Sequence, residues 1–276
     1  TDFLHVRDVR RLSFRLGLAG DSTRKYCGPC SLGLALVERL RFHYHEERPG
    51  FSDLSVLFTS TNLHADEGNK NDKGDRVYEL RTYYANEGKL NALHARFRDH
   101  TCDLFEKHGM QNVAYWVPVD NQANTLVYIV SHASREAGKK SWGAFLKDPD
   151  WQAAYKASVR DGKLVRKIER VFLTATDYSP ELKIEAGNPV RLFELRTYTT
   201  HEGKHPDINK RFRDHTCALF ARHGITNLLY CDLMKDQKGS DMTLTYLIAH
   251  KDQKARAASW DAFRKDPDWQ AARKAS

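Results

Sequence analysis

Side chains alternate between two chemical faces from residue 77 to residue 84. Glu79, Arg81 and Tyr83 fall on one face, whereas Tyr78 and Leu80 fall on the other. A period of two residues is typical of a β-strand whose faces meet different surroundings. We expect the face with Tyr78 and Leu80 to pack against helices and the face with Glu79 to point away from them.

The pattern changes to a helical period at residue 89. Leu90, Leu93, Phe97 and Leu104 recur at helical spacing, and Gly109 suits the left-handed residue that ends a helix. The spacing therefore predicts one helix over residues 89–108.

The segment that follows combines strands and helices. Residues 113–117 and 125–131 are predicted strands joined by a polar loop, followed by a helix over 134–158 and a strand over 167–176. Asp148-Pro149 interrupts the helix, because Asp is a good N-cap and Pro is favoured at the first helical position. The order βαββαβ is typical of the ferredoxin-like fold, an antiparallel sheet with both helices on one face.

This whole pattern occurs twice. Residues 79–83 (Glu-Leu-Arg-Thr-Tyr) return as 194–198, and the copies are identical at 21 of the 38 positions from 79 to 116. Such self-similarity indicates two homologous units. We assign the chain to the α+β class, with tandem ferredoxin-like units over 76–180 and 190–276. Residues 1–75 are interpreted as an irregular N-terminal extension that ends in a polar linker.

Each unit would leave one sheet face uncovered, and two units in one chain can bury these faces against each other. Glu79, Arg81 and Tyr83 would then point into the space between the sheets. These polar groups need partners there, because burying an unpaired charge is costly. Two interpretations stay open: they pair across the pseudo-twofold axis, for example Glu79 with Arg196, or they line a central polar cavity.

The second unit lacks a counterpart to the last strand of the first. Ser276 aligns with Ser158, after which the first unit continues into its fourth strand. We expect the backbone of Phe193–Tyr198 to form an open edge that promotes self-association. In the alternative, Val56–Asn62, which resembles Val171–Asp177, supplies the missing strand.

Charge and composition argue against two classes of protein, those that bind nucleic acid and those that are integral to a membrane. The 276 residues carry 44 basic and 36 acidic side chains, a net charge of +8, but the two signs are mixed along the chain, so we expect no nucleic-acid partner. No run of eighteen apolar residues occurs, so we expect no segment integral to a membrane. The compartment stays unassigned.

The sequence carries no metal or cofactor motif. Neither His-Glu-x-x-His nor paired Cys-x-x-Cys sets occur, so we expect no metal and no cofactor. Cys27-Gly-Pro-Cys30 resembles the thioredoxin redox motif. A polar segment, Asp21–Tyr26, precedes it where a thioredoxin fold requires a hydrophobic strand, so a redox site is not favoured.

Two histidines are the candidate catalytic groups. His100 and His215 occupy equivalent positions in the two copies, each three residues after a stripe phenylalanine. An imidazole titrates near neutral pH, so each could act as a general acid or base or contact a ligand. The alternative is a half-buried histidine bonded to a strand carbonyl or a tyrosine hydroxyl.

The repeated motifs resemble those of the NIPSNAP family. The resemblance covers about 180 residues in two copies and rests on Glu-Leu-Arg-Thr-Tyr, Phe-x-x-His, Lys-His-Gly, an aromatic strand and Asp-Pro-x-Trp. In the first copy the matching residues are Glu79, Leu80, Arg81, Tyr83, Phe97, His100, Lys107, His108, Gly109, Tyr115, Trp116, Asp148, Pro149 and Trp151. The second copy departs from the motif with Arg222 in place of the lysine and Cys231 in place of the tryptophan.

The resemblance implies the dimeric α+β barrel fold, here formed within one chain. That superfamily includes cofactor-independent monooxygenases, isomerases, haem enzymes and members without assigned activity, and fold does not settle function. We expect a binding or interaction module of unassigned activity, with a small molecule or a protein as partner. The alternative is a cofactor-independent enzyme, of monooxygenase or isomerase type, that acts on a small aromatic or oxygenated molecule.

The same resemblance and the strand patterns give the candidate ligand-binding residues. They are Arg81, Tyr83, His100, Tyr115, Trp116, Arg196, Tyr198, His215 and Tyr230. A pocket that uses aromatic contact should be better formed in the first copy, because Cys231 offers far less stacking surface than Trp116.

Overall fold

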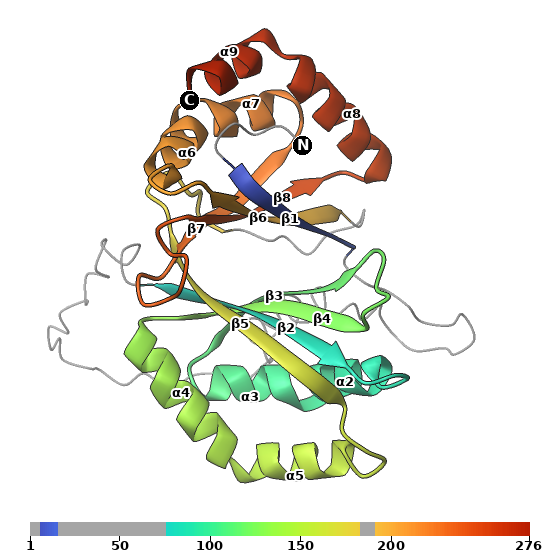
Figure 1. Ribbon diagram of the computed structural model, residues 1–276. Helices are drawn as coiled ribbons and strands as arrows, with labels where there is room; N and C mark the ends of the chain where they lie inside the picture. The colour runs from blue at the N-terminus through green and yellow to red at the C-terminus, as the bar shows by residue number, and fades with distance from the viewer. Residues whose placement is uncertain (1–5, 16–75, 183–190) are drawn as a thin grey trace, which may run out of the picture.

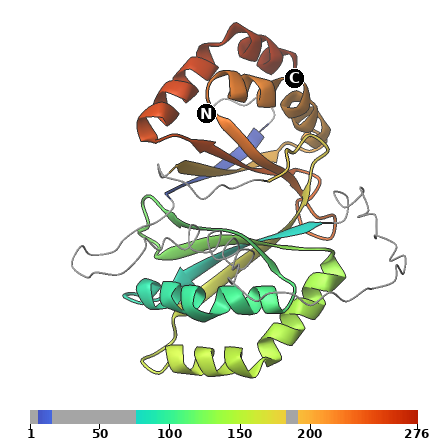
Figure 2. The ribbon, with the colours of Figure 1, turned by 180° about the vertical axis from the view of Figure 1, so that it is seen from behind.

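The computed structural model describes residues 6–15, 76–182 and 191–276. Within this part, eight antiparallel strands close a barrel in the order β1-β3-β4-β2-β5-β7-β8-β6. Figure 1 shows the two halves of the barrel facing each other, with helices on the outer side of each half. Figure 2 shows the same arrangement from behind. Cys27 to Cys30 and Val56–Asn62 lie outside the described residues.

Unit one (residues 76–182) has the predicted βαββαβ order. Its elements are β2 (Val77–Ala85), α2 (Leu90–Arg96), the π-helical turn η1 (Phe97–Thr101), α3 (Cys102–Lys107), β3 (Gln111–Pro118), β4 (Thr125–His132), α4 (Arg135–Lys147), α5 (Pro149–Ser158) and β5 (Val165–Ala175). Asp148 caps α5 by accepting hydrogen bonds from the backbone amides of residues 150 and 151, as its sequence predicts.

Unit two (residues 191–276) repeats this order up to its last helix. Its elements are β6 (Leu192–Thr200), α6 (His205–Arg211), the π-helical turn η2 (Phe212–Thr216), α7 (Cys217–Arg222), β7 (Thr226–Leu233), β8 (Thr243–His250), α8 (Gln253–Lys265) and α9 (Pro267–Ala275). The α+β class and the two repeated units are confirmed.

The predicted open edge of unit two is wrong, because β1 (Val6–Arg15) pairs antiparallel with β6 along its length. Leu12 lies opposite Leu195, as Val171 of β5 lies opposite Leu80 in unit one. The β1–β6 ladder and the β5–β2 ladder both shift register at the equivalent place, near the start of β1 and of β5. The missing strand thus comes from the beginning of the chain, and the expectation of self-association through this edge loses its basis.

The sequence of β1 explains why it fits. Residues 6–12 read Val-Arg-Asp-Val-Arg-Arg-Leu, and residues 165–171 of β5 read Val-Arg-Lys-Ile-Glu-Arg-Val. β1 closes the barrel by a short pairing with β3, and β5 does so by a short pairing with β7. The N-terminal strand therefore has the pseudosymmetric position of β5.

The predicted orientation of β2 and β6 is also wrong. A core formed by residues of both units, and by no helical residue, includes Trp116, Phe193 and Leu195, with Tyr78 and Leu80 packed against it. Tyr83 belongs instead to the core beneath the helices of unit one. The apolar face of each strand thus enters the space between the sheets, and the face with the charged residues meets the helices. A strand pattern defines two faces but not which layer each one meets.

Candidate functional site

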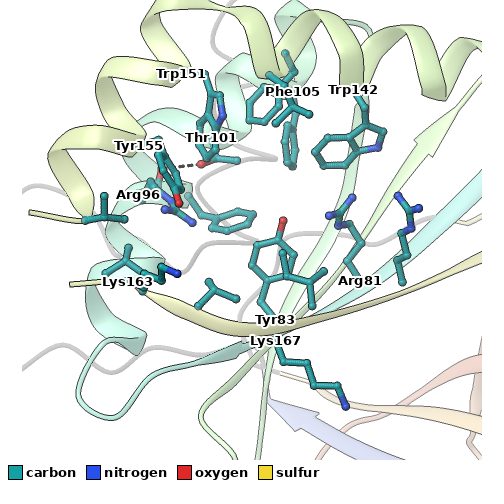
Figure 3. A pocket seen from close by; sticks show the side chains of 18 of the residues that line it. Arg81, Tyr83, Arg96, Thr101, Phe105, Trp142, Trp151, Tyr155, Lys163 and Lys167 are labelled. Atoms are coloured by element: carbon teal, nitrogen blue, oxygen red, sulfur yellow. Dashed lines mark hydrogen bonds between the residues drawn. The ribbon is translucent and has the colours of Figure 1, made fainter.

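A cavity of about 760 Å³ lies in unit one between the sheet and its helices. Its walls come from β2, the end of α2, the turn η1, helices α3, α4 and α5, and β5 with the loop before it. Figure 3 shows the side chains of Tyr83 and Arg81 rising from the sheet toward this cavity, with Trp151, Phe105 and Trp142 on the helical side. Cavities of this size hold small organic molecules.

The end of α2 and the π-helical turn η1 place Arg96, Phe97 and Thr101 at the cavity. Phe97 and Thr101 are almost fully buried, and the Thr101 hydroxyl donates to the Arg96 carbonyl at 3.1 Å. A π-turn inserts an extra residue into a helix and changes the direction of the side chains that follow, which is frequent at functional sites. The same turn occurs at η2, so it belongs to the repeat.

Arg96 is a buried cation that lacks a carboxylate partner among the described residues. Its side chain is 6% exposed, and its guanidinium lies over the rings of Trp151 and Tyr155 at 5.3 and 5.5 Å. Nη1 donates to the Ser158 hydroxyl at 3.2 Å, and Nε has no acceptor. Burial lowers the pKa of Arg96, but a guanidinium stays protonated in proteins. Arg96 therefore brings a positive charge to the cavity wall.

Arg81, on the opposite side of the cavity, is already paired. Its Nη1 donates to Glu79 Oε1 at 2.8 Å, and its guanidinium stacks on Trp142 at 4.1 Å. Glu79 is fully buried and also accepts from His132 Nε2 at 3.0 Å and from Trp142 Nε1 at 2.6 Å. Burial opposes its ionisation, yet His132, Arg81 and Trp142 together lower the pKa of Glu79. The Glu79–Arg81 pair contributes little net charge to the cavity.

The entrance of the cavity is apolar and positively charged. Leu146, Tyr155 and Ile168 line it and are 56%, 45% and 47% exposed. They are three of the four large hydrophobic side chains that are exposed in the described part of the chain. Three exposed cations on β5 and the loop before it also line the cavity: Lys163, Arg166 and Arg170. No aspartate or glutamate lines this cavity.

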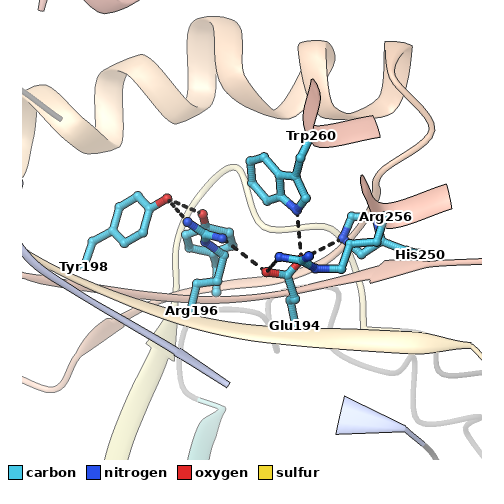
Figure 4. Close-up of polar contacts among 7 residues, drawn as sticks. Glu194, Arg196, Tyr198, His250, Arg256 and Trp260 are labelled. Atoms are coloured by element: carbon cyan, nitrogen blue, oxygen red, sulfur yellow. Dashed lines mark hydrogen bonds and ion pairs between the residues drawn. The ribbon is translucent and has the colours of Figure 1, made fainter. Parts of the chain in front are cut away.

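In unit two, the glutamate that corresponds to Glu79 is Glu194, and the side chains around it form a closed polar network (Figure 4). Glu194 accepts from His250, Arg256, Trp260 and Arg196 at 3.0, 2.7, 2.8 and 3.2 Å. Burial opposes its ionisation, but these bonds hold the pKa of Glu194 well below its usual value.

Arg256 has no counterpart in unit one, where the equivalent residue is Gly138. A Cβ at Gly138 would lie 3.0 Å from ring carbons of His132. In unit two the second arginine leaves Arg196 free to donate to the Tyr198 hydroxyl at 3.0 Å, and Tyr246 donates to the same hydroxyl at 2.8 Å. The tyrosine that corresponds to Tyr83 is thus tied into a closed network.

Unit two also has a smaller cavity, of about 390 Å³, beside Arg211 and His215. Its lining includes Asp207 and Asp214, which pair with Lys204 and Lys210. Arg273 replaces Tyr155 at the equivalent position. The second cavity therefore lacks the aromatic walls and the uniformly positive lining of the first.

The predicted site residues of unit one are divided among four places. Arg81 and Tyr83 line the 760 Å³ cavity. Tyr115 lies in the core beneath the helices and donates to Asn112, and Trp116 lies in the core between the sheets, 5.9 Å from the ring of Phe193. His100 is exposed and outside the cavity lining. The idea that Tyr115, Trp116 and His100 share one pocket is wrong, because successive residues of β3 point to opposite faces.

In unit two, Arg196 and Tyr198 belong to the network around Glu194. Tyr230 is buried and bonded to Asn227, and His215 is exposed at the smaller cavity. The proposed pairing of Glu79 with Arg196 across the two units is replaced by pairing within each unit. A ligand-binding role for these residues stays a prediction.

Sequence reasoning missed Arg96, Trp142, Trp151 and Tyr155 as site residues. Arg96 directly precedes the stripe residue Phe97 and returns as Arg211, so a repeated arginine on the apolar side of a helix was the available signal. It carried little weight, because an arginine is rarely buried in a protein unless it is paired.

Neither a metal-binding cluster nor a membrane-crossing helix occurs in the described part of the chain. Across residues 6–15, 76–182 and 191–276, no group of three or more His, Cys, Asp or Glu side chains could hold a metal ion. None of the helices in these same ranges has the length and apolar character needed to cross a membrane.

Fold and site define an intramolecular dimeric α+β barrel made of two ferredoxin-like units, with the larger of the two cavities described above in unit one. The sequence profile of the NIPSNAP family matches residues 78–180 and 193–276, and the chain belongs to this family.

Three known proteins are similar to this chain. A protein of Dictyostelium discoideum described as a NipSnap homolog is 24% identical over 196 residues, which cover 70% of this chain and 78% of that protein. A NIPSNAP family protein of unknown function from Agrobacterium tumefaciens is 22% identical, with a TM-score of 0.35, and covers 39% of this chain and 94% of its own. A putative monooxygenase from Fusobacterium nucleatum is 14% identical, with a TM-score of 0.47, over 72% of this chain and 84% of its own.

Proposed function

We propose that the chain is a small-molecule-binding module in which unit one holds the ligand and unit two completes the barrel. The observation that carries this proposal is the 760 Å³ cavity of unit one, with its aromatic walls and exposed apolar entrance. Exposed large hydrophobic side chains that border one cavity are typical of a binding site.

Binding is favoured over catalysis by what lines the cavity. The polar groups there include two buried arginines and Tyr83, and no histidine, cysteine, aspartate or glutamate is among the lining residues. An arginine cannot accept a proton at neutral pH. The nearby carboxylate of Glu79 accepts from three donors, which lower its pKa and make it a poor proton acceptor. A general base for an oxygenase or isomerase reaction is therefore not present on this wall.

Titration calorimetry on the full chain tests the proposal with two series of probes. Within each series the apolar body stays the same and the charge changes. The two series are 1-naphthoate, 1-naphthol and 1-naphthylmethylamine, and decanoate, decanol and decylamine. We expect at least one probe to bind saturably with one site per chain. The substitution Val159→Trp places an indole at a half-buried position of the cavity wall and should weaken that binding at least tenfold.

The matched control is Val119→Trp, at a position that is 49% exposed and does not line the cavity. It should leave binding unchanged. If no probe binds, or if both variants bind like the parent chain, the proposed function is wrong.

A further inference from the structure

We propose that the ligand of the unit-one cavity is an amphipathic organic acid whose anionic group is bound by Arg96. This inference rests on the proposed binding function and adds the chemical class of the ligand and the residue that anchors it.

Arg96 is the buried cation of the cavity wall that lacks an anionic partner among the described residues. It is more than nine-tenths buried, its guanidinium lies near the rings of both Trp151 and Tyr155, and it donates to one neutral hydroxyl, Ser158. The Nε–H group of Arg96 is buried and has no acceptor. A desolvated cation without a partner is costly, and a guanidinium pairs best with a planar carboxylate or a phosphate-like group. An organic acid in the cavity would supply that partner.

Arg81 does not compete for this role. Its charge is already offset by Glu79 at 2.8 Å, and the fully buried carboxylate of Glu79 would repel a second anion beside it. In Figure 3, Arg81 and Trp142 lie on the side of the cavity opposite Arg96. The acid group is therefore assigned to the Arg96 side and the apolar body to the side of Trp142 and Phe105.

The entrance favours the same class of ligand. Lys163, Arg166 and Arg170 give it a positive charge, and no acidic residue lines the cavity to offset them. Leu146, Tyr155 and Ile168 offer an apolar surface at the same place. A neutral apolar ligand would gain nothing from the cations, and a small inorganic anion would gain little from the aromatic walls. An organic acid uses both.

The repeat supplies a matched control. Arg211 stands where Arg96 stands and donates to the Ser276 hydroxyl in the same way. Its cavity has about half the volume, and Asp207 and Asp214 line it. Arg211 also lies over a tryptophan ring, that of Trp269 at 5.5 Å, but no phenylalanine, tyrosine or tryptophan lines the cavity beside it, so its loss should not affect an organic acid.

The test compares each acid with its alcohol by calorimetry at pH 7.5, using decanoate against decanol and 1-naphthoate against 1-naphthol. The wild-type chain should bind each acid at least tenfold more tightly than the matching alcohol. Arg96→Met, which keeps the apolar stem, should weaken acid binding tenfold or more and alcohol binding less than twofold. Arg96→Lys should restore part of the preference, and Arg211→Met should change nothing.

A second variant keeps the test valid if Arg96→Met fails to fold. Gln152 lines the cavity from α5 and is exposed, so Gln152→Glu adds a carboxylate with little cost to folding. It should weaken acid binding about three- to tenfold and leave the alcohols unchanged.

The outcomes separate the two proposals. If alcohols bind as tightly as acids, the ligand class is wrong although the binding function stands. If the acid preference survives Arg96→Met or is lost equally in Arg211→Met, the anchor is wrong. If no probe binds, both proposals fail.

Discussion

The two units of this chain share a fold and more than half of their residues in the aligned helices. The buried glutamate at the equivalent strand position nevertheless has different partners in each unit. Glu79 pairs with one arginine, Arg81, whereas Glu194 pairs with Arg196 and Arg256. The second arginine closes the polar network of unit two onto Tyr198. In unit one Gly138 takes that place, and the side of the strand that carries Tyr83 faces an open cavity. One glycine-for-arginine difference thus accompanies the contrast between a unit with an open cavity and a unit with a closed polar network.

The units also differ in the origin of their fourth strand. Unit one uses β5, which follows α5 directly, and unit two uses β1 from the other end of the chain. Both strands have the same register, so the barrel keeps its pseudosymmetry although the connectivity does not. Unit two therefore depends on a segment distant in sequence, and unit one does not.

The largest expected effect comes from removing that segment. Deletion of residues 1–15 should expose the edge of β6 and lower stability by about 5 kcal/mol, with a fall in Tm of about 10 °C or more. Light scattering should then show association of the truncated chain. In a control, residues 6–14 are replaced by the sequence of residues 165–173, and stability should stay within about 1 kcal/mol of the parent. A truncated chain that is monomeric with an unchanged Tm would refute the role of β1.

The next effect separates the two carboxylate networks. Glu194→Gln leaves two buried arginines without their anion and should cost about 3 to 5 kcal/mol of unfolding free energy in urea. Glu79→Gln leaves one arginine, which borders a cavity, and should cost about 1 to 3 kcal/mol. Equal losses at the two positions would contradict the difference between the networks.

A smaller effect tests Gly138, which allows His132 to approach α4. Ala in place of Gly normally stabilises a helix by up to about 1 kcal/mol. Gly143→Ala, in the same helix with nothing within 4 Å of the added carbon, should show this gain. Gly138→Ala must displace the His132 ring and should instead destabilise by about 1 kcal/mol. Chemical denaturation checks whether the two substitutions have opposite signs.

The smallest effect concerns a feature that the units share, the aspartate that caps α5 and α9. Hydrogen bonding to His223 lowers the pKa of Asp266 to about 2, against about 3.9 in an unfolded chain. Because the folded pKa is the lower one, this stabilisation is present above pH 4 and is lost as the pH falls toward 2. The difference in unfolding free energy between the parent and Asp266→Asn should therefore shrink over that window. A difference that stays constant from pH 5 to pH 2 would show that the pKa of Asp266 is not depressed.

Much of this architecture could be predicted from the sequence, because the repeat and the two hydrophobic periods fix the order of elements. Asp148 and Pro149 even marked the break between α4 and α5. The layer that each face of β2 meets could not be predicted, since Tyr78 and Leu80 suit either an inter-sheet core or a helix-covered one. The role of residues 6–15 was missed because a strand partner can lie anywhere along the chain, and local patterning does not reveal it.

The candidate site was predicted only in part, and the reason is geometric. Arg81 and Tyr83 were named from the strand motif and do line the cavity. Arg96 ends α2, where a buried arginine without an anion is unusual, and Trp142 and Tyr155 come from helices whose distance from the sheet no sequence period encodes. His100 was chosen for its chemistry, but it lies in the turn η1 and is exposed.

The central claim is that one ligand site exists per chain and that it lies in unit one. A crystal of the full chain grown with 10-bromodecanoate tests this most directly, because the bromine atom can be located by its anomalous scattering. The account predicts one bromine peak per chain, inside the cavity bordered by Tyr83 and Trp142, with the carboxylate at Arg96. A peak between the two sheets, a peak of equal height in unit two, or a carboxylate turned away from Arg96 would contradict it.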